Sequence, residues 1–584
     1  MTAPRSARRR LTSLARLATG LVSLAVLAGC STVPGSFTAR VPTAGPIEQG
    51  EQVGVDPEDQ FIRVIARGPR DGMSPTEVVQ GFLDASASFD GGHAVARQFL
   101  TRAASITWDT NAGVRVYEAT SSLNELGRTV VMSAAETGRI ATNGRYEVQG
   151  PGTELRESFT LVKVDGEWRI DDVPEGLLLT QTDVDRAFRS FAVYFFNPTF
   201  DTLVPDARMI PVVGAGLATT LVRRLVAGPS EWLQPAVRTG FPDGVKLNID
   251  AVPIESGIAR VDLTANARAA DDATRQALSQ QIVWTLRQLP DVVAVDITAA
   301  GQPLLVPGAP SPQPRDAWPA VDPNGLPAGS SGYAARPDGV VKLIPTGVRP
   351  VAGDAGTGDI PLVDIAVSND SQSLAGIDAQ GAVWKGRMIE GAPLIQIREP
   401  GSPTGLAFDR STSVWLVDPD LGLISVAGDG AVEPITVSGL TRRTSLVAAI
   451  PSRDGTRAAL VIRRGPRTGL LLARVIRSSG GATSIVINEP IRVESRLVEV
   501  VDAAWSGANT LSVLGSESAG ALQVFDIDLA RGVSVPRGTP DSPITVAAAP
   551  GLPTLVGAAD GLVYGFTTGA WQERVRGSSP TYPG

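Results

Sequence analysis

Few side chains in this sequence are of the types that usually perform chemistry, and their spacing restricts what they could do. The 584 residues include one cysteine, Cys30, and one histidine, His93. A single cysteine cannot close an internal disulfide, and neither residue can supply the several ligands of a cysteine- or histidine-rich metal centre. His93 could still act as a lone acid or base. Its position after Gly91-Gly92, near an expected helix start, favours a surface or capping role.

Acidic residues are the other candidates for acid–base chemistry or cation binding. Asp171-Asp172 lies in an expected strand, where adjacent side chains point to opposite faces, and Asp271-Asp272 lies at an expected helix start, where carboxylates interact favourably with the helix dipole. Solvated turns and caps therefore explain both pairs. Asp370, Asp409 and Asp454 could converge in a hydrolase site, but turn chemistry explains an aspartate at these positions equally well.

The sequence lacks the motifs of several enzyme classes. It contains neither a GxxxxGK[ST] phosphate-binding loop nor a GxSxG nucleophile elbow, and a single histidine rules out HExxH. The formal net charge is −8, whereas nucleic-acid-binding domains are normally basic. We therefore expect no catalytic residue, no metal, no cofactor and no nucleic-acid partner.

The amino terminus predicts export from the cytoplasm. Five arginines and no acidic residue occur in residues 1–29, and residues 17–27 are mostly apolar. That stretch is shorter than the roughly 20 apolar residues that span a bilayer, so it is typical of a signal peptide. It ends in Leu27-Ala28-Gly29-Cys30, which resembles the lipobox of bacterial lipoproteins.

The lipobox resemblance implies cleavage between Gly29 and Cys30, followed by attachment of an S-diacylglyceryl and an N-acyl group to Cys30. Such chains would hold the protein on the extracytoplasmic face of the cell membrane, at about 0.8 kcal/mol per buried CH₂. The alternative is an ordinary secretory signal with an incidental cysteine. The only cysteine of the chain lies at the one position that a lipobox requires.

The first part of the mature chain divides into a tether and a small domain. Residues 30–60, rich in Pro, Gly, Thr and acids, predict a tether. Residues 61–188 predict an α+β domain, because Ser74-Pro75-Thr76-Glu77 forms a capping box, a second helix is expected over residues 93–102, and Asp165-Gly166 joins two alternating runs as a hairpin. The run "VDGEWRIDDVPEG" is similar to that of NTF2-like cone folds, which often hold a pocket.

Residues 189–307 predict a second, α/β domain. We expect a strand at residues 193–196, a helix that ends at Gly228-Pro229, two strands joined by Ser256-Gly257, a helix over residues 273–289 and a last strand at residues 292–297. The order "LVAGPS", "FPDG", "ARVDLT", "QQIVWTLRQLPDV" and "VDITAAGQPL" resembles the GerMN domain. That resemblance implies a ring-building α/β fold associated with protein–protein assembly.

The last part of the chain repeats. Residues 308–332 are dense in Pro, Gly and Ser and predict a linker. In residues 333–584, four-strand units are expected around Ala366, Ala407, Ala448, Ala503 and Ala547, which are 41, 41, 55 and 44 residues apart. This period predicts a β-propeller, with residues 337–344 in a further blade that could close the ring against the carboxy terminus. A β-sandwich, the alternative, should not repeat so regularly.

The order of these parts resembles that of the LpqB lipoproteins of actinobacteria, over essentially the whole mature chain. The fold class is thus multidomain: an NTF2-like α+β domain, a GerMN-like α/β domain and an all-β propeller. The resemblance implies a non-enzymatic accessory lipoprotein that contacts the extracytoplasmic domain of a membrane sensor histidine kinase, in the MtrA–MtrB two-component system. Its role would lie in envelope homeostasis and cell division. The alternatives are a lipoprotein that binds a cell-wall or lipid fragment and a propeller hydrolase.

Overall fold

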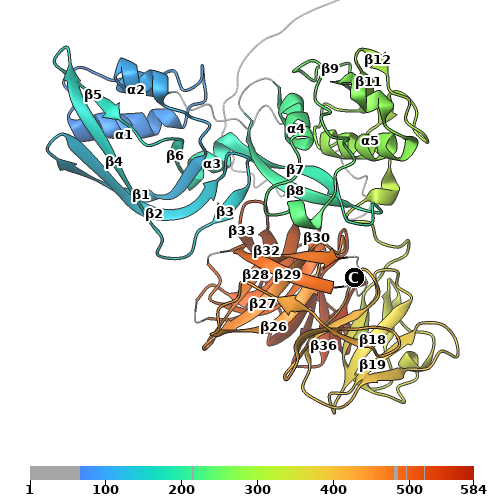
Figure 1. Cartoon of the computed structure of the whole chain (residues 1–584). Coiled ribbons are helices and arrows are strands. Elements are labelled where there is room, and N and C mark those ends of the chain that lie inside the picture. The colour runs from blue at the N-terminus through green and yellow to red at the C-terminus, as the bar shows by residue number, and fades with distance from the viewer. Residues whose placement is uncertain (1–65, 213–215, 479–483, 495, 519) are drawn as a thin grey trace, which may run out of the picture. The chain divides into compact units, whose positions relative to one another are not determined.

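Three folded segments follow one another in the computed structural model (Figure 1). The structure describes residues 66–212, 216–478, 484–494, 496–518 and 520–584. The signal peptide, the lipobox with Gly29 and Cys30, and the tether lie outside the described residues. In the part that the structure describes, no helix combines the length and apolarity needed to cross a bilayer.

The first segment packs short helices against a curved sheet that is antiparallel except for the parallel pair of β1 and β6, as the α+β prediction expects (Figure 1). Helix α1 (Pro75–Ser86) starts with the predicted capping box, in which the Ser74 hydroxyl accepts from Glu77 N and the Glu77 carboxylate accepts from Ser74 N. The sheet has the order β5-β4-β2-β1-β6, with β3 beside β2. Its strands are β1 (Val114–Leu126), β2 (Thr129–Ile140), β3 (Tyr146–Val148), β4 (Glu154–Val164), β5 (Glu167–Asp172) and β6 (Leu177–Thr180).

Two local predictions for this segment have different outcomes. The β4–β5 hairpin is confirmed, and Asp165 and Gly166 both have positive φ, as a two-residue hairpin turn requires. The single helix expected over residues 93–102 is wrong. A short 3₁₀ helix, η2 (Ala96–Phe99), stops at an extended Leu100, and Thr101 then caps a new helix, α2 (Arg102–Thr107), by accepting from Ala104 N. The likeness to NTF2-like cones is not confirmed.

The second segment contains a strand–helix–strand unit, in agreement with the α/β prediction. Strands β10 and β11 pair in parallel, and helix α5 connects them. The first of the two strands predicted around Ser256-Gly257 is reduced to the two residues of β9, because Pro253 has no N–H to donate to a ladder. The elements are α3 (Gln181–Ala187), β7 (Phe188–Phe196), β8 (Leu203–Pro211), α4 (Leu217–Val226), β9 (Ile254–Glu255), β10 (Ile258–Leu263), α5 (Asp272–Leu286), β11 (Ala294–Ala299) and β12 (Gln302–Pro303).

The Pro-rich residues 308–332 make specific contacts with this second segment. Strand β13 (Gln313–Pro314) pairs with β11, and Gln313 accepts a hydrogen bond of 2.6 Å from the buried Ser279 hydroxyl of α5. Trp284 Nε1, also on α5, donates to the carbonyl oxygen of Trp318 at 3.1 Å. This stretch therefore packs along α5 rather than running free.

In the described residues, the third segment is a propeller of six blades, five with four strands and blade 4 with a short fifth strand, which confirms the all-β prediction. The predicted alanines Ala366, Ala407, Ala448, Ala503 and Ala547 lie in the innermost strands of blades 2 to 6. From the innermost strand outward, the blades are: blade 1, β38 (Ser578–Thr581), β14 (Tyr333–Ala335), β15 (Val341–Ile344), β16 (Gly347–Pro350); blade 2, β17 (Leu362–Val367), β18 (Ser373–Asp378), β19 (Val383–Arg387), β20 (Ile395–Arg398); blade 3, β21 (Thr404–Phe408), β22 (Val414–Asp418), β23 (Gly422–Val426), β24 (Val432–Pro434); blade 4, β26 (Thr444–Pro451), β27 (Arg457–Arg464), β28 (Arg467–Ser478), β29 (Ser484–Arg492); blade 5, β30 (Glu499–Gly507), β31 (Thr510–Ser516), β32 (Gln523–Asp528), β33 (Val533–Gly538); blade 6, β34 (Pro543–Ala547), β35 (Leu555–Ala558), β36 (Leu562–Thr567), β37 (Ala570–Arg576).

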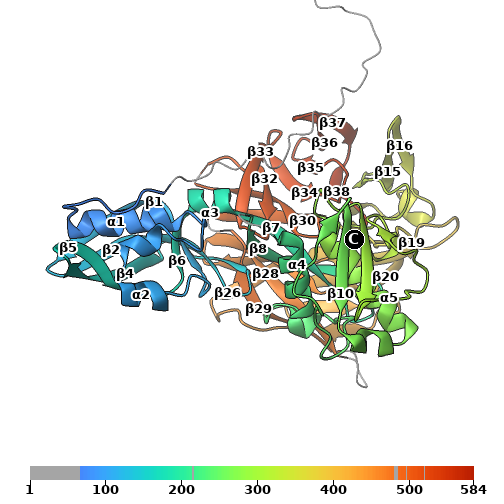
Figure 2. The same cartoon turned by 90° about the horizontal axis from the view of Figure 1, so that it is seen from above.

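Blade 1 is assembled from the two ends of the propeller sequence. Its outer strands β14, β15 and β16 come from the start of the repeat, and its innermost strand β38 comes from residues 578–581. Figure 2 shows the yellow β15 and β16 beside the red strands of blade 6 and β38. The predicted closure of the ring against the carboxy terminus is therefore confirmed.

The 55-residue spacing in the repeat has a structural cause in blade 4. Its strand β28 has 12 residues and β29 has nine, longer than their counterparts in the other blades. This long hairpin contacts the second segment, because Arg474 Nη1 donates to Trp232 O at 2.7 Å and Trp232 Nε1 donates to Glu489 O at 2.9 Å. The short β25 (Thr436–Val437) adds a further strand beside β29.

Substitutions at Tyr582 test the ring closure. Its ring is buried and its hydroxyl donates to Pro553 O at 2.6 Å, which ties the segment after β38 to blade 6. Because truncation leaves a cavity, we expect Tyr582→Ala to lower the free energy of unfolding by about 3–5 kcal/mol. Tyr582→Phe, which removes only the hydroxyl, should cost about 1 kcal/mol. Denaturant unfolding of the full chain measures both, and equal losses for the two variants would contradict the packing role.

Candidate binding site in the propeller channel

The six innermost strands share a deviation from regular pairing. In blades 2 to 6 the register with the second strand shifts near the start of the innermost strand, at Val363, Gly405-Leu406, Val447, Val501 and Ile544. In blade 1, β38 shows a shift between the partners of Tyr333 and Ala335. Such β-bulges leave the extra residue out of the ladder and bend the strand. The channel mouth at which the innermost strands begin is therefore a ring of bulges.

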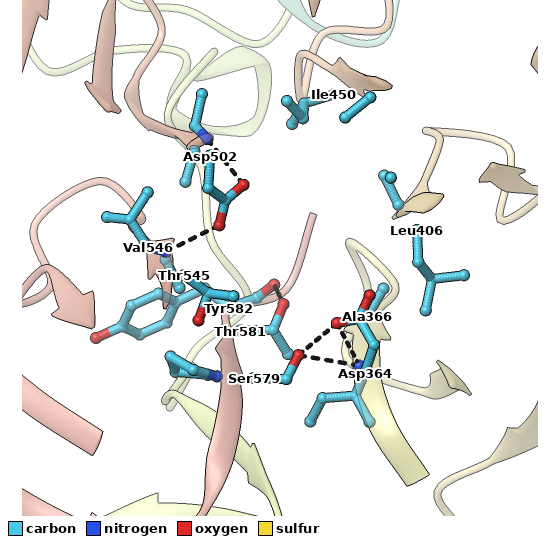
Figure 3. Close-up of a pocket in the computed structure, with 18 of the residues that line it drawn as sticks. Asp364, Ala366, Leu406, Ile450, Asp502, Thr545, Val546, Ser579, Thr581 and Tyr582 are labelled. Atoms are coloured by element: carbon cyan, nitrogen blue, oxygen red, sulfur yellow. Dashed lines mark hydrogen bonds between the residues drawn. The ribbon is translucent and has the colours of Figure 1, made fainter. Parts of the chain in front are cut away.

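A cavity of about 240 Å³ lies at this ring and is lined by residues of all six innermost strands (Figure 3). Four of the residues at the bulges are aliphatic and line the cavity: Leu406, Val447, Val501 and Ile544. We call these four the collar. Two of them remain well exposed, with 36% of Val501 and 51% of Ile544 accessible to solvent. The collar thus offers apolar surface at the opening of the channel.

Two aspartates that follow bulge residues also line the cavity. Asp364 Oδ1 accepts from Ile365 N at 2.9 Å and from the Ser579 hydroxyl of β38. Asp502 accepts from Ala503 N through Oδ1 and from Val546 N of β34 through Oδ2, both at 2.8 Å. Each carboxyl therefore satisfies the N–H of the next residue and connects its own blade to a neighbouring blade (Figure 3).

Burial changes the acidity of both carboxyls. It raises the pKa of Asp364 above its ordinary value, against the opposing effect of its two hydrogen bonds. It raises the pKa of Asp502 to about 7, and the charge of Asp364 adds to this shift. Among the described residues, no lysine or arginine contributes to either pKa. The cavity therefore contains two carboxyls that lack a cationic partner within the described part of the chain.

The aspartates predicted as hydrolase candidates lie elsewhere, in the turns that follow the innermost strands. Asp370 accepts from the Ser368 hydroxyl and Gln372 N, and Asp409 accepts from the Ser411 hydroxyl and Ser413 N. Asp454 accepts from Thr456 N and pairs with Arg457 at 2.6 Å. Each carboxylate is thus used by its own turn, as turn chemistry predicts.

The two acidic pairs also have local roles. Asp271 is the N-cap of α5 and accepts from Thr274 N at 2.8 Å, which confirms the capping prediction. Asp171 and Asp172 are exposed at the end of β5, where Asp171 accepts from the Thr101 hydroxyl at 2.9 Å. Among the described residues, no group of three or more His, Cys, Asp or Glu side chains is arranged to hold a metal ion.

The surface or capping role expected for His93 is wrong. His93 is 5% exposed and packs between Phe89 and Trp108, with ring centroids 4.7 and 5.9 Å away. The chain turns inward here because Gly91, Gly92 and His93 all have positive φ. Nδ1 lies 3.1 Å from Ser86 O, and burial lowers the pKa of the imidazole. His93 is a core residue of the first segment.

Comparison with known proteins agrees with this architecture. Family models match residues 68–185 (lipoprotein LpqB, N-terminal domain), residues 192–305 (sporulation and spore germination) and residues 338–583 (lipoprotein LpqB β-propeller domain). The lipoprotein LpqB of Thermobifida fusca (strain YX) is 31% identical over 96% of this chain and 99% of its own length. That of Mycobacterium tuberculosis (strain CDC 1551 / Oshkosh) is 27% identical over 98% of this chain and its whole length.

Among solved structures, the tandem GerMN domains of the sporulation protein GerM from Bacillus subtilis are 24% identical, with a TM-score of 0.19, over 22% of this chain and 45% of that one. The fold and the matched models together define a multidomain lipoprotein class in which a GerMN domain precedes a β-propeller. The chain belongs to the LpqB lipoprotein family.

The raised pKa of Asp502 predicts how stability depends on pH. A carboxyl whose folded pKa of about 7 exceeds its unfolded value, roughly 3.9, contributes stability that is complete below the unfolded pKa and is lost as pH rises through 7. The free energy of unfolding of the wild type should therefore fall, relative to that of Asp502→Asn, between pH 5 and pH 8. Urea unfolding across this range measures the difference. The exposed control Asp429→Asn should parallel the wild type, and a parallel curve for Asp502→Asn would contradict the assignment.

Proposed function

We propose that this protein is a non-enzymatic accessory lipoprotein, anchored on the extracytoplasmic face of the cell membrane by acyl groups on Cys30. Its partner is the extracytoplasmic domain of a membrane sensor histidine kinase, that of the MtrA–MtrB two-component system, in envelope homeostasis and cell division. Membership of the LpqB lipoprotein family and the lipobox-like Leu27-Ala28-Gly29-Cys30 support the proposal.

One observation favours a binding role over a hydrolytic one. The acidic side chains predicted as hydrolase candidates already have hydrogen-bond partners in their own turns. Asp370, Asp409 and Asp454 form hydrogen bonds within their own turns, so they do not present a pair of carboxylates across one cleft. The opposite mouth instead exposes apolar collar residues around a cavity. An apolar rim with a few polar groups suits recognition of a partner or ligand.

The lipid anchor contributes by raising the effective concentration of the binding surfaces. A protein held at the membrane samples a thin layer in which a membrane kinase presents its sensor domain. The propeller and the GerMN-like segment are joined through contacts such as Arg474 with Trp232, so one anchored chain brings both surfaces to that layer. Regulation should therefore depend on the anchor more strongly than binding itself does.

Crosslinking in cells tests the partner. The full-length protein should recover the sensor kinase, and a version without residues 333–584 or one without residues 189–307 should lose most of that recovery. A chain with the exposed substitution Asp429→Asn serves as the control. If neither deletion changes recovery of the kinase, the proposed partnership is wrong.

Replacement of Cys30 by alanine tests the anchor. We expect Cys30→Ala to release the protein from the membrane and to weaken regulation of the kinase, while the purified protein still binds the isolated sensor domain. Transcription from a kinase-dependent promoter and pull-down with the sensor domain measure the two effects. Normal regulation by a fully released protein would contradict a role for the anchor.

A second candidate function is the capture of a cell-wall or lipid fragment in the propeller channel. The cavity at the ring of bulges favours it, because its lining combines the aliphatic collar with the carboxyls of Asp364 and Asp502. Binding of such a fragment would favour one conformation of the propeller face, and the partner would recognise that conformation.

A further inference from the structure

We propose that the mouth of the propeller channel binds an organic cation, a protonated amine carried on an aliphatic chain. The ammonium would lie between Asp364 and Asp502, and the methylene chain would pack against the collar. This inference stands apart from the kinase proposal, because the cavity would recognise the amine whichever molecule carries it.

The position of the two carboxyls supports a single cationic guest. The ring order of innermost strands is β38, β17, β21, β26, β30 and β34, so Asp364 on β17 and Asp502 on β30 are three blades apart in a ring of six. They therefore face the channel from opposite sides, and Figure 3 shows them on different sides of the cavity. A cation near the channel axis is attracted by both, and its charge relieves the repulsion between them.

Both carboxyls retain capacity to accept further hydrogen bonds. An ionised carboxylate offers about four acceptor positions. The two bonds to Asp364 both use Oδ1, and the two to Asp502 use one position on each oxygen. An ammonium group has three donors and no acceptor, whereas an ionised carboxylate can only accept. The ammonium group therefore complements Asp364 and Asp502, whose positions are already fixed by their hydrogen bonds to the blades. A neutral alcohol or an anion would not gain this charge-assisted interaction.

The collar determines which kind of chain can carry the ammonium group. Val501 and Ile544 leave apolar surface exposed at the opening, above the carboxyls that follow in the same or the neighbouring strand. An alkyl stem with a terminal ammonium buries its methylenes on such surface while its charge reaches the polar floor. The shared chemistry fits two sources, a free alkyl amine and a lysine side chain of another protein.

Calorimetric titration of the full chain in detergent at pH 8 tests the proposal with hexylamine as the probe. We expect saturable binding that Asp364→Asn weakens by about tenfold or more, since the carboxyl charge is lost while Oδ1 can still accept from Ile365 N and Ser579. Asp429→Asn should leave the affinity unchanged, and hexanol, the neutral counterpart, should not bind. Thermal unfolding checks that each variant remains folded.

A second variant and a second ligand complete the test. Ile544→Ser should weaken hexylamine binding but leave any binding of methylammonium unchanged, because only the longer amine reaches the collar. A peptide with one lysine, compared with its norleucine counterpart, distinguishes a protein source from a free amine, and binding of either amine supports the site. No binding of hexylamine or of the lysine peptide at millimolar concentration, equal binding of hexanol, or an unchanged affinity in Asp364→Asn overturns it. If crosslinking to the kinase survives Asp364→Asn, the proposed kinase partnership does not depend on the amine site, and the two proposals are tested separately.

Discussion

The structure of the propeller depends on how it satisfies backbone polar groups where six strands approach one axis. Each innermost strand is the edge of its own sheet and pairs with only one neighbour, so the N–H groups freed by its bulge need other partners. Asp364 and Asp502 supply those partners and reach the next blade as well. Thr404 donates to Val447 O at 2.7 Å, and Trp505 Nε1 donates to Ile450 O at 3.1 Å, which joins two further pairs of neighbouring blades.

The same bonds have an electrostatic consequence. The carboxyls that join the blades are partly withdrawn from water, which disfavours their ionised forms, and the charge of Asp364 adds to this effect at Asp502. The propeller tolerates these two carboxyls because each accepts two hydrogen bonds. In addition, a buried carboxyl can be protonated or can bind a cation from solution. The two carboxyls that hold blades together are thereby also the groups on which the proposed amine site depends. The same two side chains therefore join the blades and form the proposed amine site at this mouth.

Much of the fold could be predicted from the sequence because it is encoded locally. The capping box at Ser74, the Asp165-Gly166 turn and the alanine period of the propeller each follow from short-range rules, and each is present in the structure.

The burial of His93 could not be predicted, because it depends on Trp108, which lies further along the chain and meets the imidazole only after folding. The channel carboxyls were missed for a similar reason. Asp364 and Asp502 occur in only two of the repeats, and their opposition across the ring requires the blade count. A bulge leaves no reliable signature in an alternating strand, although Val363-Asp364 and Val501-Asp502 share one dipeptide at equivalent positions.

Closure of the ring by β38 also sets an order of events during folding. Tyr333 of β14 pairs with Thr581, so the two partners are separated by nearly the whole length of the propeller sequence. Pairs so distant in sequence form slowly, because a long loop must close before the contact contributes any stability. A chain that is synthesised amino terminus first would present five complete blades and one incomplete blade until residues 578–581 are available. Through that interval β14 offers an unpaired edge to other extended chains. Rapid pairing of residues 578–581 with β14 is therefore the step that would protect the newly made protein from aggregation.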